Sequence, residues 1–337
     1  MDKGAPNIAI LGAGVVGLTV ADILQKDLGK ANITIIADKF KEDTTSAVAA
    51  GIFCPGSSFR GATREITHKW IDDSWYYWQD ILKSSEASNA GIMELSTYIF
   101  ARDNYELTKN PLLEHLVSNY RAAREDELKL CGPGWKYGSY FTTVKIGCDR
   151  YLPWVERRFV DKGGRIVSGK VDSFTSLRQY DLVFNCTGLG AKYLCNDFDI
   201  FPLRGQVIRV KAPWLKTAFF CDYDTYIIPG MDGVTTLGGV RQHDNSNLQV
   251  CKYDAHAIWQ QCCEILPDLR KAEIIGHNVG LRPYRVPVRV EPEVIGGVKV
   301  VHCYGHGANG VMSSPGTALN AVKIGYDYLK SNIRNKL

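Results

Sequence analysis

The sequence predicts an α/β fold in which a Rossmann-like parallel sheet is interleaved with a second domain built on a mixed, largely antiparallel sheet. Three observations predict it. A glycine-rich turn joins an apolar strand to a helix near the N-terminus. Strands ending in glycine-rich turns recur in the middle and near the end of the chain, whereas residues 202–240 are strand-rich and punctuated by turns. The length of 337 residues exceeds one ordinary hydrophobic core, so two domains are expected.

The N-terminal stretch reads as a βαβ unit. A strand over 7–11 is followed by Gly12-Ala13-Gly14-Val15-Val16-Gly17, a helix over 18–24 and a strand over 33–37. This glycine pattern binds a pyrophosphate, because its backbone approaches closely and the helix N-terminus offers free N–H groups. Asp38 stands at the end of the second strand, where an acid binds ribose hydroxyls and disfavours a 2′-phosphate. Lys39 beside it slightly weakens this preference for a nucleotide without a 2′-phosphate.

The first half of the chain then predicts two helices and two strands before a fourth helix. A helix over 65–82 carries an aromatic stripe, which we interpret as core: Trp70, Trp75, Tyr76, Tyr77 and Trp78. Strands are predicted over 93–101 and 139–146, separated by a helix over 110–127 that is entered at Pro111. A further helix over 152–161 ends at two glycines.

The second half alternates short strands with two helices. Strands are predicted over 165–167, 170–174, 180–185, 273–279, 286–291 and 298–304. The apolar strand over 180–185 runs into Cys186-Thr187-Gly188, which indicates another close backbone approach. Helices are predicted over 255–265 and 314–331, the latter after a glycine-rich loop over 305–310.

Composition excludes several classes of protein. Forty basic and 36 acidic residues give a net charge of +4 without a long like-charged run, so no nucleic-acid partner is expected. The ten cysteines form no CxxC pair and no zinc-ligand spacing, which is typical of reduced thiols in an intracellular protein and predicts no metal site. We find no signal peptide and no apolar stretch long enough to span a membrane, and expect a soluble protein.

Four stretches together resemble one family. They are residues 12–17, residues 183–188 with Pro202-Leu-Arg-Gly-Gln206, Gly280-Leu-Arg-Pro283, and residues 301–310 with Gly316-Thr-Ala318. The chain looks like a member of the FAD-dependent D-amino acid oxidase and D-aspartate oxidase family. The resemblance implies a Rossmann-like FAD-binding domain over 1–85, 150–190 and 292–337, and a substrate domain over 86–149 and 191–291. It also implies oxidation of a small D-amino acid, with O2 as acceptor and hydrogen peroxide as product.

The same resemblance implies which residues hold FAD. Gly12 to Gly17 would bind the pyrophosphate and Asp38 the adenosine ribose. Lys39, next to Asp38, is also expected among the cofactor-binding residues. The remaining residues that it places along the phosphates and the flavin are Thr44, Thr45, Ser46, Ala50, Gly51, Val171, Thr187, Gly188, Gly307, Ala308, Asn309, Gly310, Val311 and Met312. Backbone N–H groups in a glycine loop before a helix can stabilise negative charge on a reduced flavin.

On the substrate side, three residues are expected around the reacting group. A carboxylate removed from water needs a fixed cation, which Arg282 would supply bidentately. By resemblance, the Tyr226 hydroxyl bonds the same carboxylate and the Ala308 carbonyl accepts a hydrogen bond from the amino group. No catalytic side chain is predicted, because hydride passes directly to the flavin. By the same resemblance, His306 has a structural role.

Arg241 is the residue on which the side-chain preference depends. The D-aspartate branch resembles this chain in having an arginine here, and a buried guanidinium without a carboxylate partner is costly. This favours D-aspartate, with D-glutamate and N-methyl-D-aspartate as relatives. Alternatively, Arg241 pairs with Asp222 or Asp224 of the chain itself. The loop over 219–224 also lacks the further arginine expected in that branch.

Other readings stay open. The chain could oxidise neutral D-amino acids, or be a non-catalytic flavin-binding sensor; the second-half motifs disfavour an NAD-dependent dehydrogenase. Asn335-Lys336-Leu337 approximates a peroxisomal address, so we expect binding to the import receptor and a peroxisomal location, with the cytoplasm as the alternative. The oligomeric state is not readable from the sequence.

Overall fold

The computed structural model describes residues 5–29, 31–222 and 224–334, in which fourteen strands form one continuous mixed sheet. Along the main path the order is β4-β5-β3-β9-β10-β11-β8-β13-β14-β7-β1-β2-β6, and β12 pairs with β8. The sheet confirms the predicted α/β class. The division into two domains with the predicted boundaries stays a prediction.

The nucleotide half of the sheet is parallel around β1 (Asn7–Leu11). β1 pairs with β2 (Asn32–Ala37) and β7 (Leu182–Asn185), and the half is completed by β6 (Arg165–Ser168) and β14 (Val298–His306). Both faces of β1 are buried, since Ile8 and Ile10 pack in one hydrophobic cluster and Ala9 and Leu11 in another. This explains the continuous apolar run in the sequence.

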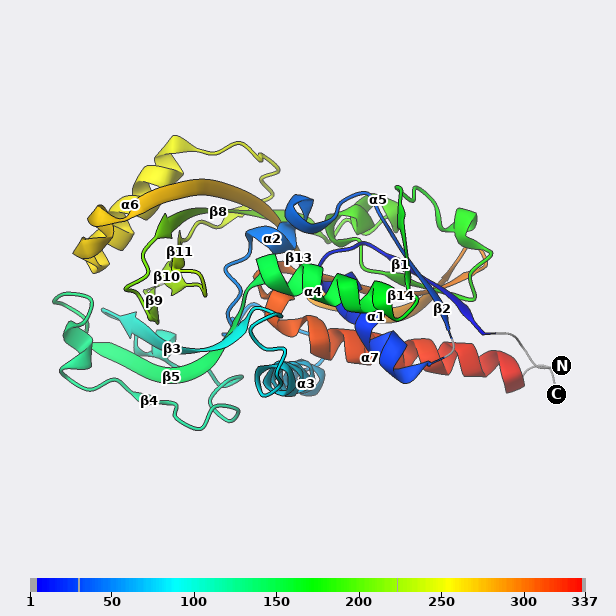
Figure 1. Cartoon of the computed structure of the whole chain (residues 1–337), viewed down its shortest axis with the longest axis horizontal. Coiled ribbons are helices and arrows are strands. Elements are labelled where there is room, and N and C mark those ends of the chain that lie inside the picture. The colour runs from blue at the N-terminus through cyan, green and yellow to red at the C-terminus, as the bar shows by residue number, and fades with distance from the viewer. Residues whose placement is uncertain (1–4, 30, 223, 335–337) are drawn as a thin grey trace.

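Helices cover one face of this half. α1 (Val15–Asp27), α3 (Arg64–Leu82), α4 (Cys148–Asp161) and α7 (Gly310–Arg334) group together in Figure 1. In α3, Trp70, Trp75 and Trp78 are buried as predicted, but Tyr76 is 62% exposed and lies outside the core. The Nε1 of Trp78 donates to the carbonyl of Met312, which joins α3 to the start of α7.

The second half of the sheet is mostly antiparallel. Its strands are β3 (Ile92–Ala101), β4 (Arg121–Ala122), β5 (Tyr137–Ile146), β8 (Phe201–Lys211), β9 (Thr217–Cys221), β10 (Thr225–Pro229), β11 (Val234–Gly238) and β12 (Gln242–His243). Among the described strands of this half, only β3 and β9 pair in parallel. α6 (Lys252–Ile265) packs against it through Ile258, Cys262 and Cys263.

One strand joins the two halves. β13 runs without interruption from Glu273 to Ile295, pairing first with β8 and then with β14, and Figure 1 shows it spanning from α6 toward the nucleotide half. The prediction of two separate strands over 273–279 and 286–291 was therefore wrong. Pro283 lies between them and Pro287 near the start of the second, and the pairing with β14 shifts register between Tyr284 and Arg289. The prolines marked an irregularity rather than an end.

Two further element predictions were wrong. Residues 110–127 form turns, the short β4 and a 3-10 turn (Glu127–Lys129) instead of a helix. Tertiary hydrogen bonds hold this segment, because the side chain of Asn110 donates to the Pro55 carbonyl and that of Asn119 to Thr142. Residues 170–173 are irregular and lead into a 3-10 turn (Phe174–Leu177), so the strand over 170–174 is absent.

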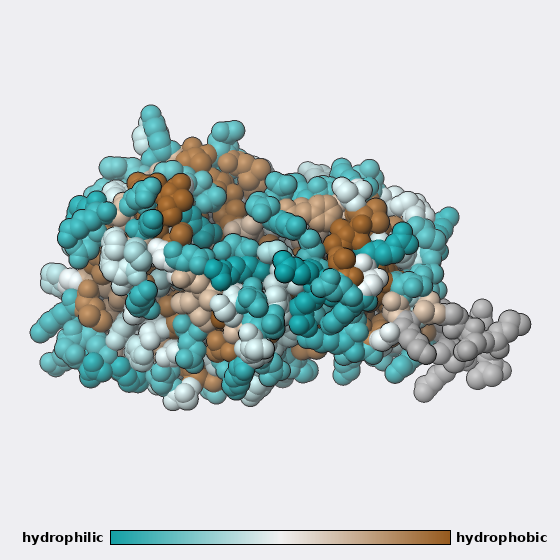
Figure 2. All heavy atoms as spheres, viewed as in Figure 1, coloured by the Kyte–Doolittle hydropathy of each residue, from teal (hydrophilic) through white to brown (hydrophobic). Residues whose placement is uncertain are grey.

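The remaining short elements lie beside the nucleotide half or at the ends of the other strands. They are α2 (Thr45–Val48), α5 (Ala191–Leu194) and the 3-10 turns Lys41–Asp43, Tyr105–Thr108, Gly188–Gly190, Pro267–Lys271 and Gly307–Asn309. Figure 2 shows a largely hydrophilic face with separate apolar groups. None of the helices in the described part of the chain is long and apolar enough to cross a membrane.

Candidate cofactor and substrate site

The glycine loop after β1 is shaped by close backbone contacts. Gly12 has a φ of +100°, and a Cβ there would lie 2.6 Å from the carbonyl oxygen of Cys186. A Cβ on Gly17 would lie 2.0 Å from the Gly12 carbonyl oxygen. Both positions therefore require glycine. The loop packs directly on the segment that follows β7, as the close approach predicted at Thr187 and Gly188 requires.

The N-terminus of α1 opens from this loop. Gly14 is its N-cap and has no side chain with which to bond the first amides. Ser46, from α2, approaches instead, and its Oγ accepts from the Val15 amide at 3.1 Å. Ala13 and Val15 are buried. The positive end of the helix dipole thus faces a cradle formed by backbone and one hydroxyl, which suits a phosphate group.

The acid expected at the ribose ends the neighbouring strand. Asp38 and Lys39 directly follow β2 and both are exposed. Val171 follows β6, the strand that pairs with β2, and is half-buried. All three lie beyond the carboxyl ends of adjacent parallel strands, where ligands of such sheets bind.

The segments expected at the flavin are tied together by side-chain hydrogen bonds. The Oδ1 of Asn309 accepts from the Gly56 amide at 3.1 Å, joining the two loops. Thr45 donates to the Leu281 carbonyl at 3.1 Å, and buried Thr44 donates to Lys41. Gly51, next to Ala50, has a φ of +63°, and a Cβ there would lie 1.8 Å from the carbonyl oxygen of Ile146.

The second flavin segment leads into α7. Gly307 to Asn309 form a 3-10 turn, and α7 begins at Gly310, four residues earlier than the predicted 314. Ala308 is exposed, whereas Asn309, Val311 and Met312 are buried. His306 is buried with its Nε2 2.9 Å from the Thr317 hydroxyl, so it ties the turn to α7.

Arg282 lies flat across a glycine of the neighbouring strand. A Cβ on Gly205 of β8 would lie 2.3 Å from Nη1 and 2.4 Å from Nη2 of Arg282, so only glycine leaves room for this guanidinium. Its Nη1 donates to the carbonyl of Val240 at 3.1 Å. The contact brings the motifs around Gly205 and Arg282 together in the folded chain.

Tyr226 is placed in the same way. Its ring lies across Gly238 and Gly239, since a Cβ on Gly238 would lie 2.2 Å from Cζ and 2.4 Å from the hydroxyl oxygen. Burial raises the pKa of Tyr226, while the charges of Arg282 and Arg241 act to lower it. The hydroxyl is therefore protonated at neutral pH, and the charges of both guanidinium groups act on it.

Arg241 forms an ion pair within the chain. Its Nε lies 2.8 Å from Oδ1 of Asp224, and the two side chains are 53% and 48% exposed. Asp222, the other acid considered as a partner, pairs with Arg102 instead. The expectation of a buried guanidinium was therefore wrong, because the Arg241 side chain is half exposed and already paired. An ion pair in solvent contributes little and is readily exchanged.

Comparison with known proteins places this arrangement in a family. The model of the family described as FAD dependent oxidoreductase matches residues 7–323. A D-aspartate oxidase of Homo sapiens is 39% identical over 94% of each chain, and a D-amino acid oxidase of Dugesia ryukyuensis is 36% identical over 90% of this chain and 92% of the relative. The chain belongs to the D-amino acid oxidase family of FAD-dependent oxidoreductases. It is a flavoprotein oxidase with FAD as cofactor.

Solved structures show the same fold at low identity. A glycine oxidase of Geobacillus kaustophilus has a TM-score of 0.79 at 17% identity and covers 96% of this chain and 95% of its own. An FAD-bound L-alpha-glycerophosphate oxidase of Mycoplasma pneumoniae has a TM-score of 0.72 at 16% identity, covering 95% of this chain and 94% of its own. The glycine cradle and the uncapped N-terminus of α1 fit the pyrophosphate of FAD.

Two cationic side chains near the flavin segments, Lys145 and Arg209, were not predicted from the sequence. Lys145 on β5 pairs with Ile52 in an isolated bridge, and its Nζ is 3.4 Å from the Ile146 carbonyl. Burial lowers the pKa of Lys145 to about 8, and the nearby charge of Arg209 adds to the effect. Arg209 donates to the Val48 carbonyl at 3.2 Å. The signal available in the sequence was a lysine between Val144 and Ile146 in a predicted strand.

We expect Lys145→Met to stabilise the oxidase at pH 7. Lowering a lysine pKa from 10.5 to about 8 at 1.36 kcal/mol per pKa unit corresponds to about 3 kcal/mol of lost stability. Below pH 8 the full cost is present, because both folded and unfolded states are charged. Between pH 8 and 10.5 the folded state holds fewer protons than the unfolded one, so wild-type stability rises and the advantage of the variant shrinks.

Urea denaturation at pH 7 and pH 10 measures this effect. Lys211→Met is the matched control, since Lys211 ends β8 exposed to solvent, and we expect no comparable gain from it. A Lys145→Met protein that is less stable than wild type at pH 7 would contradict the interpretation, because it would mean that the ammonium group has strong compensating partners.

Proposed function

We propose that this oxidase acts on acidic D-amino acids, with D-aspartate as the main substrate and D-glutamate or N-methyl-D-aspartate as relatives. The products would be a 2-oxo acid, ammonia and hydrogen peroxide. The curated relative at 39% identity, named D-aspartate oxidase, supports this substrate class. The next relative at 36% is named a D-amino acid oxidase, so similarity by itself leaves the side-chain preference open.

One observation carries the proposal: three polar groups converge on the segment from Gly238 to Arg241. Tyr226 lies across its first two residues, and Arg282 donates to the Val240 carbonyl. Arg241 ends the segment, and the charges of both arginines act on Tyr226. A segment that carries one guanidinium group and binds a second suits a substrate with two carboxylates better than a substrate with one.

Each group then has a defined part. Arg282 and Tyr226 bind the α-carboxylate, the Ala308 carbonyl accepts a hydrogen bond from the amino group, and Arg241 exchanges Asp224 for the side-chain carboxylate. Bound FAD supplies the acceptor for the hydride leaving the substrate Cα. The protein contributes orientation and exclusion of water, so no side chain is assigned as a catalytic base.

The test is anaerobic reduction of the purified yellow enzyme by D-aspartate and, separately, D-alanine, followed as flavin bleaching. We expect D-aspartate to reduce it much faster. We expect Arg241→Leu to lower kcat/KM for D-aspartate by about 10- to 100-fold, which corresponds to the free energy of one hydrogen bond to a charged group. The kcat/KM for D-alanine should stay nearly unchanged.

Asp224→Asn is the companion variant. It removes the competing carboxylate, so it should lower the KM for D-aspartate without changing that for D-alanine. Faster bleaching by D-alanine, together with an unchanged preference in Arg241→Leu, would move the assignment to neutral D-amino acids. A flavin that stays oxidised with both substrates would favour the non-catalytic alternative.

A peroxisomal location would suit an enzyme that produces peroxide. The tripeptide that suggested it and binding to an import receptor, Asn335-Lys336-Leu337, lies outside the described residues. Both remain proposals that depend on the sequence alone.

A further inference from the structure

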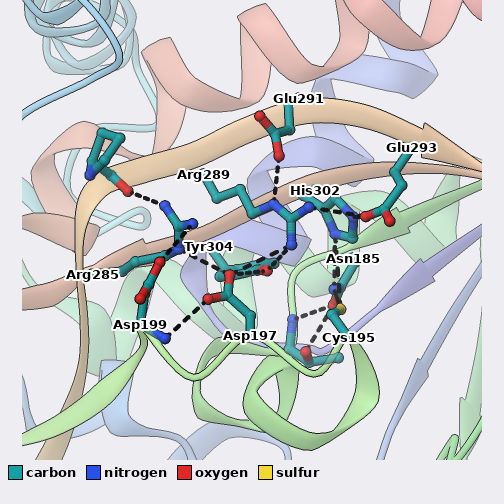
Figure 3. Close-up of polar contacts among 12 residues, drawn as sticks. Asn185, Cys195, Asp197, Asp199, Arg285, Arg289, Glu291, Glu293, His302 and Tyr304 are labelled. Carbon is teal, nitrogen blue, oxygen red and sulfur yellow. Dashed lines mark hydrogen bonds and ion pairs between the residues drawn. The ribbon is translucent and has the colours of Figure 1, made fainter.

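A buried polar network lies behind the loop that follows β7. Figure 3 shows His302 of β14 between Glu293 of β13 and Asn185 of β7. The His302 ring is fully buried; its Nε2 lies 2.9 Å from Glu293 and its Nδ1 3.2 Å from the Asn185 Nδ2. Asn185 in turn bonds Thr187, receiving its amide at 3.3 Å and its hydroxyl at 2.7 Å.

These contacts determine where the protons are. The Thr187 amide can only donate, so the atom of Asn185 that faces it is the oxygen. The Asn185 amide nitrogen therefore donates to Nδ1 of His302, and also to the Cys195 sulfur at 3.0 Å. Nδ1 must then carry no proton, and the proton on Nε2 is donated to Glu293.

The network ends at the cofactor cradle. A Cβ on Gly12 would lie 3.5 Å from the Cα of Thr187 and 2.6 Å from the Cys186 carbonyl oxygen, so the backbone held by Asn185 forms one wall of the glycine loop. We infer that Glu293, neutral His302 and Asn185 form a hydrogen-bonded relay that positions Thr187 against the FAD-binding loop, and that protonation of His302 frees Thr187 from this position.

Protonation would reverse one hydrogen bond. A proton on Nδ1 would face the amide protons of Asn185, and the amide could accept it only by turning its oxygen away from Thr187. The surroundings oppose the cation: burial and the charge of Arg289 lower the pKa of His302, outweighing Glu293 and Glu291.

Other elements complete the surroundings of the ring. Tyr304 of β14 and Phe174 pack against it edge-on, with centroids 5.5 and 6.5 Å away. The Cys195 sulfur lies 4.0 Å from Nδ1, and burial raises the pKa of that thiol to about 11, so it stays neutral. Asp197 is held by Arg285, Arg289 and the Tyr304 hydroxyl. Release of the relay is therefore expected only below the ordinary histidine pKa of about 6.5.

The experiment measures the FAD dissociation constant between pH 5 and 8.5, by quenching of protein fluorescence as FAD is added to stripped enzyme. For wild type we expect a constant value above pH 7 and a rise of up to about tenfold per pH unit below the pKa of His302. His302→Leu should bind FAD about 10- to 100-fold more weakly at pH 8, with no such rise on acidification. His256→Leu is the control, since this histidine is exposed on α6, and it should follow the wild-type curve.

Glu293→Gln provides a second test. Because Glu293 is 43% exposed, its replacement should disturb packing less than the replacement of a core residue. Glutamine can still accept from Nε2 but no longer favours the cation, so the rise should move to lower pH with the affinity at pH 8 unchanged. A dissociation constant that stays level to pH 5 in wild type, or an unmoved rise in Glu293→Gln, would overturn the inference. Neither result depends on the substrate proposed above.

Discussion

Replacing Arg282 with methionine should lower kcat/KM for any amino-acid substrate by about three powers of ten, within the 2–5 kcal/mol cost of truncating one partner of a desolvated charge pair. The guanidinium lies across Gly205 and is held by the Val240 carbonyl, so its position is set before substrate arrives. Steady-state kinetics with D-aspartate and D-alanine measures the loss. Both substrates should be affected, because both carry the α-carboxylate.

Two further variants define the cause. Arg282→Lys should recover little, since an ammonium group cannot bind a carboxylate bidentately or lie flat on Gly205. Arg178→Met is the matched control: this exposed arginine also donates to a backbone carbonyl, that of Gly296 at 3.1 Å, but lies on the segment before β7. FAD content should stay at the wild-type level in all three. A kcat/KM for Arg282→Met within tenfold of wild type would exclude Arg282 as the carboxylate clamp.

Replacing Gly12 with alanine should abolish retention of FAD. The new Cβ would lie 2.6 Å from the Cys186 carbonyl oxygen, and the φ of +100° is unfavourable for alanine. Because the new Cβ would meet backbone atoms and not a flexible side chain that could move aside, the loop must open. We expect FAD affinity to fall on the order of 100-fold or more, because the cradle amides lose their alignment.

The ratio of flavin to protein absorbance after gel filtration measures this loss. Gly276→Ala is the control, because a Cβ on this glycine of β13 would have no atom within 4 Å and the residue has no positive φ. It should retain FAD like wild type. Full retention by Gly12→Ala would show that the pyrophosphate does not bind at this loop.

Much of the fold follows from local sequence signals. β1, α1 and β2 were predicted because glycine spacing and apolar runs act within a few residues. The prediction of a helix over 110–127 failed for the opposite reason, since hydrogen bonds from Asn110 and Asn119 to distant segments outweigh local helix propensity. β13 was predicted as two strands, without residues 280–285, because the two partner strands that keep it extended come from elsewhere in the chain.

The sequence by itself determined the family, the cofactor and the residues expected to bind the α-carboxylate, because those features reside in short motifs. Only the tertiary structure decided that Arg282 lies on Gly205, that Arg241 pairs with Asp224, and that Lys145 is buried. Only it placed His302 between Glu293 and Asn185. These contacts join residues far apart in the chain, and the burial that sets their charge states exists only once the sheet has assembled.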